Sequence, residues 1–216
     1  AGKPEQHLAH SSINYISPRN NHELWICTNL GVSIYNMNTD KIRAFHHLKN
    51  LNVQTCLEDQ QGHIWFGTQT GLYQYNPQTD TIRVFKSTND PNSLSNDEIK
   101  ALFEDNNANL WIGTAEGLNI LKKGEDRFIR ILPDGSPNAI SGYRVTTIKE
   151  DLQGRLWIGT SDSGLELVTN FKENPTKPAF KRILPGQVNE LLFDQSNNLW
   201  VGLGGTGRLF LINLNT

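Results

Sequence analysis

The chain has 216 residues and a formal net charge of −2, and 37% of its residues are hydrophobic. The near-neutral charge excludes strong electrostatic attraction to nucleic acid or to an anionic membrane. No apolar run reaches membrane-spanning length, no signal-peptide pattern opens the chain, and there is no initiator methionine. We therefore expect a processed or excised piece of a longer protein, with no nucleic-acid partner and no direct membrane insertion.

Five short phrases of similar sequence follow one another along the chain, and each contains one tryptophan. The tryptophans are spaced by 40, 46, 46 and 43 residues: Trp25, Trp65, Trp111, Trp157 and Trp200. A period of this length is typical of stacked supersecondary units. The regular spacing predicts that the tryptophans are structural and fill the space between repeats.

The segments around each tryptophan are β-branched or aromatic and are bounded by turn residues, which predicts strands. In the third repeat the expected strands are residues 98–103, 110–114, 118–121 and 128–132. An Asp-x-x-Gly turn, or an Asn-rich equivalent, separates the first two strands, and the recurring Asp is expected to serve that turn. The glycine two residues after most of the tryptophans leaves room for a large neighbour.

Strands such as Leu-Trp-Ile-Gly-Thr are apolar on both faces, so each small sheet must be covered on both sides. Repeated sheets of this kind predict an all-β fold, a β-propeller of five four-stranded antiparallel blades. The expected blades are residues 11–48, 51–88, 97–133, 143–185 and 186–216, in a single domain or propeller fragment spanning 1–216. Because the fifth repeat ends after three strands, either residues 1–10 close a five-bladed ring or the chain is part of a larger propeller, which we favour.

The cysteines and histidines do not indicate a metal or cofactor site, and none is expected. Cys27 and Cys56 are interpreted as small core residues, with a disulfide between them as the alternative. His46 and His47 are expected on opposite faces of a strand, so they could not bind one metal together. Residues 202–207 fit G-x-G-x-x-G but run into another strand instead of a helix, which predicts a flexible blade turn.

The phrase Glu-Asp-x-x-Gly-x-Leu-Trp-Ile-Gly-Thr-x-x-Gly-Leu resembles the two-component regulator propeller repeat. Residues 150–165 carry it almost whole, with one extra residue before Gly164, and residues 58–72 and 104–118 match nearly as well. The linker at residues 89–95 is also similar to that family. The resemblance covers nearly the whole chain and is weakest at Arg19 and Cys27 in the first repeat and at residues 203–205 in the last.

This resemblance implies a ligand-sensing, extracytoplasmic region of a bacterial inner-membrane receptor, often a hybrid histidine kinase and sometimes a diguanylate cyclase. In gut Bacteroidetes the hybrid kinases sense oligosaccharides, so the resemblance implies a periplasmic location and an oligosaccharide ligand. No kinase machinery lies in this chain, and the chain itself is expected to be non-catalytic. The family's arrays usually hold more than five blades, which supports the fragment interpretation.

Ligand-binding residues are expected where the repeats differ, in the Thr-x-x-Gly turns and in the links between blades. The candidates in these places are Tyr143, Arg144, Asp162, Glu116, Gln69, Asn29 and Gln187. The ring of Tyr143 could stack on a sugar while Arg144 bonds its hydroxyls or an acidic group. The alternative is that Tyr143 covers the seam between blades.

Two other functions stay open. The first is a scaffold propeller that binds protein without a small ligand, with a homodimer or self-association through open blade edges as a further expectation. The second is an enzyme similar to the streptogramin lyases, which would need a cluster of His, Glu and metal. His22, His63 and Glu23 are expected in turns on the opposite side from the binding turns, which disfavours the enzyme.

Overall fold

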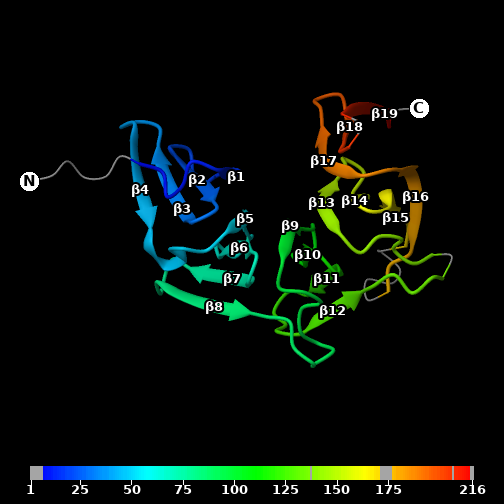
Figure 1. Ribbon diagram of the computed structural model, residues 1–216, viewed down its shortest axis with the longest axis horizontal. Coiled ribbons are helices and arrows are strands. Elements are labelled where there is room, and N and C mark those ends of the chain that lie inside the picture. Colours follow the sequence, from blue (N-terminus) through cyan, green and yellow to red (C-terminus); the bar gives the residue numbers. More distant parts are fainter. Residues whose placement is uncertain (1–6, 137, 171–176, 206, 215–216) are drawn as a thin grey trace, which may run out of the picture. The chain divides into compact units, whose positions relative to one another are not determined.

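The computed structural model describes residues 7–136, 138–170, 177–205 and 207–214. These residues form 19 β-strands and one short 3-10 helix, η1 (His46–Leu48). Strands that are consecutive in sequence pair with one another, so they form five separate sheets in chain order (Figure 1). The prediction of an all-β propeller fold with five blades is confirmed, and each sheet is one blade.

The blades follow one another along the chain. The first contains β1 (Ile13–Pro18), β2 (Glu23–Thr28), β3 (Gly31–Asn36) and β4 (Lys41–Phe45). The second contains β5 (Val53–Glu58), β6 (Ile64–Thr68), β7 (Gly71–Asn76) and β8 (Thr81–Phe85). The third contains β9 (Ile99–Glu104), β10 (Leu110–Thr114), β11 (Gly117–Leu121) and β12 (Phe128–Ile131). The fourth contains β13 (Val145–Glu150), β14 (Leu156–Thr160), β15 (Gly164–Val168) and β16 (Phe180–Pro185). The fifth contains β17 (Val188–Phe193), β18 (Asn198–Leu203) and β19 (Arg208–Asn213).

The chain divides into two compact units. The first unit comprises residues 1–86 and 97–99 and contains the first two blades. The second comprises residues 87–96 and 100–216 and contains the other three blades, apart from Ile99 at the start of β9. Each unit has its own hydrophobic core, because strands that are apolar on both faces bury side chains between successive sheets.

The aspartate six residues before a tryptophan closes the turn between the first two strands of a blade. In the third blade, Asp105 accepts the backbone N–H groups of Asn107 and Asn109, both at 2.9 Å. This is the turn role that the recurring Asp predicts. The same carboxylate also accepts the indole N–H, at 2.8–3.0 Å, in four blades: Trp65–Asp59, Trp111–Asp105, Trp157–Asp151 and Trp200–Asp194.

The glycine two residues after the tryptophan lies against the next blade. A Cβ atom on Gly113 would lie 2.7 Å from Cγ1 of Val145, and one on Gly159 would lie 2.6 Å from Cγ1 of Val188. These two valines begin β13 and β17. The expectation that this glycine leaves room for a large neighbour is therefore confirmed in the second unit.

The repeat tryptophans contribute unequally to the core. Four of them are at most 4% exposed: Trp25, Trp65, Trp111 and Trp157. Trp200 in the fifth blade is partly exposed. Both cysteines are free and lie in the core of the first unit, which agrees with their interpretation as small core residues. A hydrogen bond with Cys56, together with burial, raises the pKa of Cys27.

The fifth blade has the three strands counted from the sequence, and the expectation for two histidines differs from the structure. The fifth sheet has three strands within the described residues and residues 7–10 form no strand, while residues 1–6 of the expected closing strand lie outside the described residues. His46 and His47 lie in η1, so the prediction that they point to opposite faces of a strand is wrong. Successive residues of a 3-10 helix are about 120° apart around its axis, and the two ring centroids are 4.2 Å apart.

No helix in the described parts of the chain is long and apolar enough to cross a membrane.

Candidate functional site

Backbone hydrogen bonds join the turns and links that were predicted to bind ligand. The turn between the second and third strands of a blade bonds to a link that enters the same blade or the following one. In each case a backbone N–H of the turn donates to a carbonyl oxygen of the link, at 2.6–3.3 Å. The donor and acceptor residues are Asn29 and Ser12, Gln69 and Asn52, Gly117 and Tyr143, Ser161 and Arg144, and Gly204 and Gln187. All seven candidate residues lie in or directly beside these turns and links. The glycine-rich segment 202–207 begins in the last two residues of β18 and continues into the turn before β19, although its residue 206 lies outside the described residues.

Four of the candidates come together in the second unit, where the link into the fourth blade meets two turns. The carboxylate of Asp162 accepts the backbone N–H of Tyr143 at 2.9 Å and that of Arg144 at 3.3 Å. The carbonyl of Tyr143 accepts the N–H of Gly117, the residue after Glu116, at 2.6 Å. Tyr143 is 51% exposed, and Arg144 is exposed as well. We call Glu116, Tyr143, Arg144 and Asp162 the Tyr143 cluster.

Asp162 acts in this cluster by holding the link in place. Both of its carboxylate oxygens are engaged by backbone N–H groups, and Gly142 packs directly against it. A Cβ atom on Gly142 would lie 2.6 Å from Oδ1 of Asp162 and 2.6 Å from Oγ1 of Thr160. Asp162 therefore positions the backbone of Tyr143 and Arg144, and the side chains of these two residues are exposed.

A buried glutamate supports the same link. Glu166 in β15 is 0% exposed, and its Oε1 accepts the backbone N–H of Ser141 at 2.8 Å. Burial raises the pKa of Glu166, although hydrogen bonds from Ser141 oppose the shift. The same arrangement of a strand side chain and an incoming backbone N–H recurs in the pairs Ser33–Ala9 and Asn119–Ser95. Sequence reasoning missed Glu166, although a polar residue at this strand position in three repeats was an available signal.

The other three candidates lie elsewhere. In the first unit, the side chain of Asn29 accepts a hydrogen bond at 3.0 Å from Asn14, which also donates to Asn52 at 3.0 Å. Gln69 donates its backbone N–H to Asn52 at 3.1 Å. The structure thus brings Asn29 and Gln69 into one polar network, whereas Gln187 lies at the start of the fifth blade.

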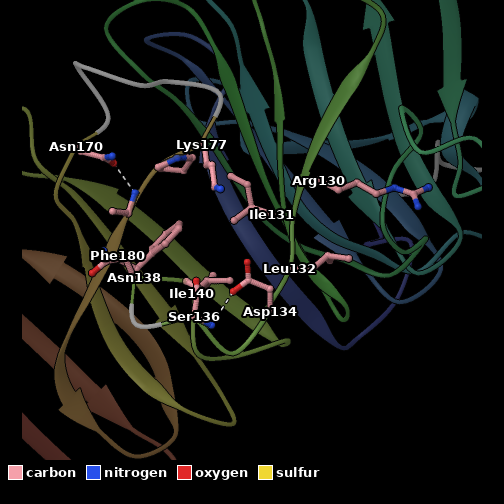
Figure 2. Close-up of a pocket in the computed structure, with 13 residues that line it drawn as sticks. Arg130, Ile131, Leu132, Asp134, Ser136, Asn138, Ile140, Asn170, Lys177 and Phe180 are labelled. Carbon is pink, nitrogen blue, oxygen red and sulfur yellow. Dashed lines mark hydrogen bonds between the residues drawn. The ribbon is translucent and has the colours of Figure 1, made fainter.

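Figure 2 shows a hollow in the second unit that the sequence did not indicate. Its volume is about 410 Å³, and it lies among the end of β12, the link that follows and the segment that leads into β16. Lys177 and Asp134 approach it from opposite sides, and Ile140 and Phe180 add apolar surface. Hydrogen bonds from Ser136, helped by the charge of Lys177, lower the pKa of Asp134. The available signal was the segment between β15 and β16, which is longer than the equivalent segments of the other blades.

Arg130 borders the hollow, but its guanidinium points away from it (Figure 2). The guanidinium donates hydrogen bonds of 2.7–3.0 Å to the link between β8 and β9, at the carbonyls of Thr88, Asp90, Ser93 and Leu94 and the hydroxyl of Ser93. A planar group with five donors suits this bundle of carbonyl oxygens. Arg130 is therefore a structural residue of the link and not a ligand contact in the hollow.

The fold and its repeats relate this β-propeller to known proteins. Two segments, residues 47–70 and 93–116, match the two component regulator propeller family. The resemblance seen in the repeat phrase is confirmed for these segments. No curated protein matches the chain.

Three solved structures share the fold. The extracellular domain of BT3049 from B. thetaiotaomicron, described as a hybrid two component system, is 23% identical with a TM-score of 0.50, over 93% of this chain and 31% of that one. PorZ, a surface component of the type-IX secretion system of Porphyromonas gingivalis, is 18% identical with a TM-score of 0.67, over 91% and 31%. Streptogramin B lyase is 13% identical with a TM-score of 0.68, over 95% and 70%. At these identities the likeness shows the fold alone, and the chain spans about a third of the length of the first two.

Proposed function

We propose that this chain is part of the extracytoplasmic sensor region of a bacterial two-component receptor. The observation that carries the proposal is the match of residues 47–70 and 93–116 to the two component regulator propeller family. The fold shared with the extracellular domain of BT3049 supports it. In this proposal the receptor is an inner-membrane protein, the propeller lies on its periplasmic side, and this chain has no catalytic role of its own.

The proposed ligand is an oligosaccharide that binds at the Tyr143 cluster. The exposed ring of Tyr143 offers an apolar face for a sugar, and the guanidinium of Arg144 offers hydrogen-bond donors for its hydroxyls or for an acidic group. The hydrogen bonds to Asp162 hold the backbone of both residues before a ligand arrives. A preformed site binds with a smaller loss of conformational entropy, which favours this place over a mobile loop.

Isothermal titration calorimetry against a panel of neutral and acidic glycan fragments tests the ligand and the site. A saturable isotherm that weakens at least about tenfold in both Tyr143→Ala and Arg144→Ala supports the Tyr143 cluster. Leu152→Ala is the matched control, because Leu152 is 81% exposed in the same blade and follows the opposite end of β13. Lys177→Ala tests the hollow of Figure 2 as the binding place.

Loss of binding in Lys177→Ala alone would move the ligand to the hollow and contradict the Tyr143 cluster. No heat with any glycan, in a chain that circular dichroism shows to be folded, would contradict an oligosaccharide ligand. The sensor role has its own test in the intact receptor with a transcriptional reporter. An unchanged response after these blades are deleted would contradict that role.

The exposed apolar face of the fifth blade favours a second function, protein binding or self-association. Leu192, Leu209 and Leu211 are 52–64% exposed. Leu192 and Leu211 flank Trp200 across the paired strands β17, β18 and β19. An apolar row on one sheet face is typical of an interaction surface. Light scattering over a concentration series tests self-association: a mass increase that Leu192→Ser abolishes supports it, and a constant monomer mass contradicts it.

A further inference from the structure

Three side chains of the first unit bring their metal-binding atoms within 4.8 Å of one another: His46, His47 and Asp80. His46 and His47 belong to η1, directly after β4 of the first blade, and Asp80 directly precedes β8 of the second. All three residues lie in the first unit. We call them the His-His-Asp cluster.

The surrounding fold supports two of the three side chains. The ring centroid of His47 lies 5.2 Å from the ring centroid of Phe45 and 5.2 Å from that of Tyr75. The hydroxyl of Tyr75 donates to Oδ1 of Asp80 at 3.0 Å, and the same oxygen lies 2.8 Å from Nε2 of His47. His46 is exposed, so its ring can rotate toward the other two without disturbing the core.

Comparison with the first blade shows which contacts of the His-His-Asp cluster are common to both blades. Tyr35 donates to Asp40 at 2.9 Å, just as Tyr75 donates to Asp80. Asp40 and Asp80 also share a φ of 54°. The tyrosine–aspartate pair is therefore a feature of this turn in both blades, and the two neighbouring histidines are an addition at the second.

An ion pair between His47 and Asp80 explains only part of the cluster. The side chain of Asp80 is 66% exposed, and exposed ion pairs contribute little to stability because solvent screens them. The ion pair also assigns no role to His46, whose ring centroid lies 4.2 Å from that of His47. A ligand shared by all three side chains accounts for the whole arrangement.

We propose that the His-His-Asp cluster binds a divalent transition-metal ion, for which zinc is the probe. Two imidazole nitrogens and one carboxylate oxygen suit zinc, copper and nickel, whereas magnesium and calcium prefer sites made of oxygen ligands. Three protein ligands leave one position of a tetrahedral zinc site for water or for an atom of a bound partner. The hydroxyl of Tyr75 orients the carboxylate, as partners of metal ligands commonly do.

The geometry needs only a small adjustment to hold zinc. Zinc–ligand bonds of about 2.0–2.2 Å place neighbouring ligand atoms roughly 3.3 Å apart in a tetrahedron. The 2.8 Å separation between His47 and Asp80 therefore opens slightly, and His46 turns inward. A bound ion would tie the link after the first blade to a turn of the second, and would raise the unfolding temperature of the first unit by mass action.

Zinc titration of the untagged chain by calorimetry tests the proposal, with cobalt absorption spectra as a second measurement. The expected result is one ion per chain and a visible cobalt band typical of nitrogen and oxygen ligands. His46→Ala, His47→Ala and Asp80→Asn are each expected to weaken zinc binding at least about tenfold. Asp40→Asn is the matched control, because it changes the equivalent carboxylate of the first blade and should leave zinc affinity unchanged. A His7→Ala/His10→Ala background removes histidines near the start of the chain that could bind zinc separately.

Circular dichroism establishes that each variant is folded, and the zinc-dependent rise in unfolding temperature gives a further measure of binding. Absence of saturable zinc binding in the folded chain would overturn the proposal. Unchanged zinc affinity in His46→Ala would also overturn it, because His47 and Asp80 would then form only an ion pair. An equal loss in Asp40→Asn would place the zinc elsewhere and contradict the cluster.

Discussion

The indole N–H of Trp111 donates to the carboxylate of Asp105 at 2.9 Å, and both residues are buried. One oxygen of Asp105 closes the turn between β9 and β10, while the other satisfies the indole inside the blade. A buried N–H group without an acceptor costs about 1–3 kcal/mol. This double use explains why Asp and Trp recur together, six residues apart, in four repeats.

Asp105→Ala is expected to lower the free energy of unfolding by about 2–4 kcal/mol, because two turn N–H groups and the indole N–H lose the carboxylate oxygens that accept them. Trp111→Phe removes the indole N–H, so the two changes in one chain should be non-additive by about 1 kcal/mol. Urea denaturation followed by circular dichroism measures the cycle. Strictly additive effects would contradict a shared hydrogen bond.

The first blade lacks this pair, because Arg19 stands in place of the aspartate. Trp25 is 2% exposed and its indole N–H has no acceptor among the described residues. The guanidinium of Arg19 lies 5.0 Å from the ring centroid of Trp25 and pairs with Glu23, which Arg43 also contacts at 3.2 Å. The blade thus replaces a hydrogen bond with a cation over the ring.

Arg19→Asp combined with Glu23→Asn copies the arrangement of Asp105 and Asn109 into the first blade. The double variant is expected to raise the free energy of unfolding of the first unit by about 1 kcal/mol, because the indole gains an acceptor. Arg19→Asp alone is the control and should not stabilise, since it places a second carboxylate beside Glu23. Thermal denaturation compares the three chains, and a double variant less stable than the parent would refute the transfer.

Gly159→Ala is expected to destabilise the chain by about 1–3 kcal/mol. The added methyl group would lie 2.6 Å from Val188 of the next blade and 2.6 Å from Thr147 of its own blade, so these side chains must move. Gly202 occupies the same repeat position in the fifth blade, and its Cβ would meet nothing closer than 3.7 Å. Gly202→Ala should therefore change stability by less than about 0.5 kcal/mol. Equal losses in chemical denaturation would show that blade contact is not the cause.

Glu166→Gln is expected to change how stability depends on pH. Burial raises the pKa of Glu166 in the folded state above its unfolded value, despite hydrogen bonds from Ser141. The folded chain then holds this proton to higher pH, so the contribution of Glu166 to the free energy of unfolding falls as pH rises from the unfolded pKa through the folded one. The variant keeps an acceptor for Ser141 and carries no charge. It should be more stable than the parent at neutral pH, with the difference shrinking in acid.

Denaturation of both chains over a pH series, from about pH 4 to pH 8, measures this effect. The difference between the two curves isolates Glu166, because every other carboxylate is common to both chains. A difference that is constant over the series would contradict a raised pKa for Glu166.

The strands could be predicted closely because their signals are local. Those expected in the third repeat at residues 98–103, 110–114, 118–121 and 128–132 are observed as β9 to β12, with ends within one residue. The prediction for His46 and His47 was wrong because the local pattern does not mark the end of the strand before them. The alternating pattern of β4 does not show where the strand ends, and Leu48 is buried at the end of a 3-10 turn instead.

The candidate site was only partly predictable. Tyr143 and Arg144 stood out because they differ from their equivalents in the other repeats, and the structure places both in an exposed link. The position of Asp162 was predictable, but its bonds to the backbone of that link were not. Glu166 and the hollow beside Lys177 and Asp134 depend on segments distant in sequence, and no single repeat indicates them.

Repeat number, strand order and the chemistry of the turns follow from the sequence alone, because they arise between residues a few positions apart. Packing of the blades determines which side chains are buried and which residues distant in sequence come into contact. It buries Glu166 against an incoming link, 25 positions away from Ser141, and brings His47 to Asp80, 33 positions away. Burial and long-range contact depend on how sheets stack, and a repeating local pattern carries no record of which side chains then meet.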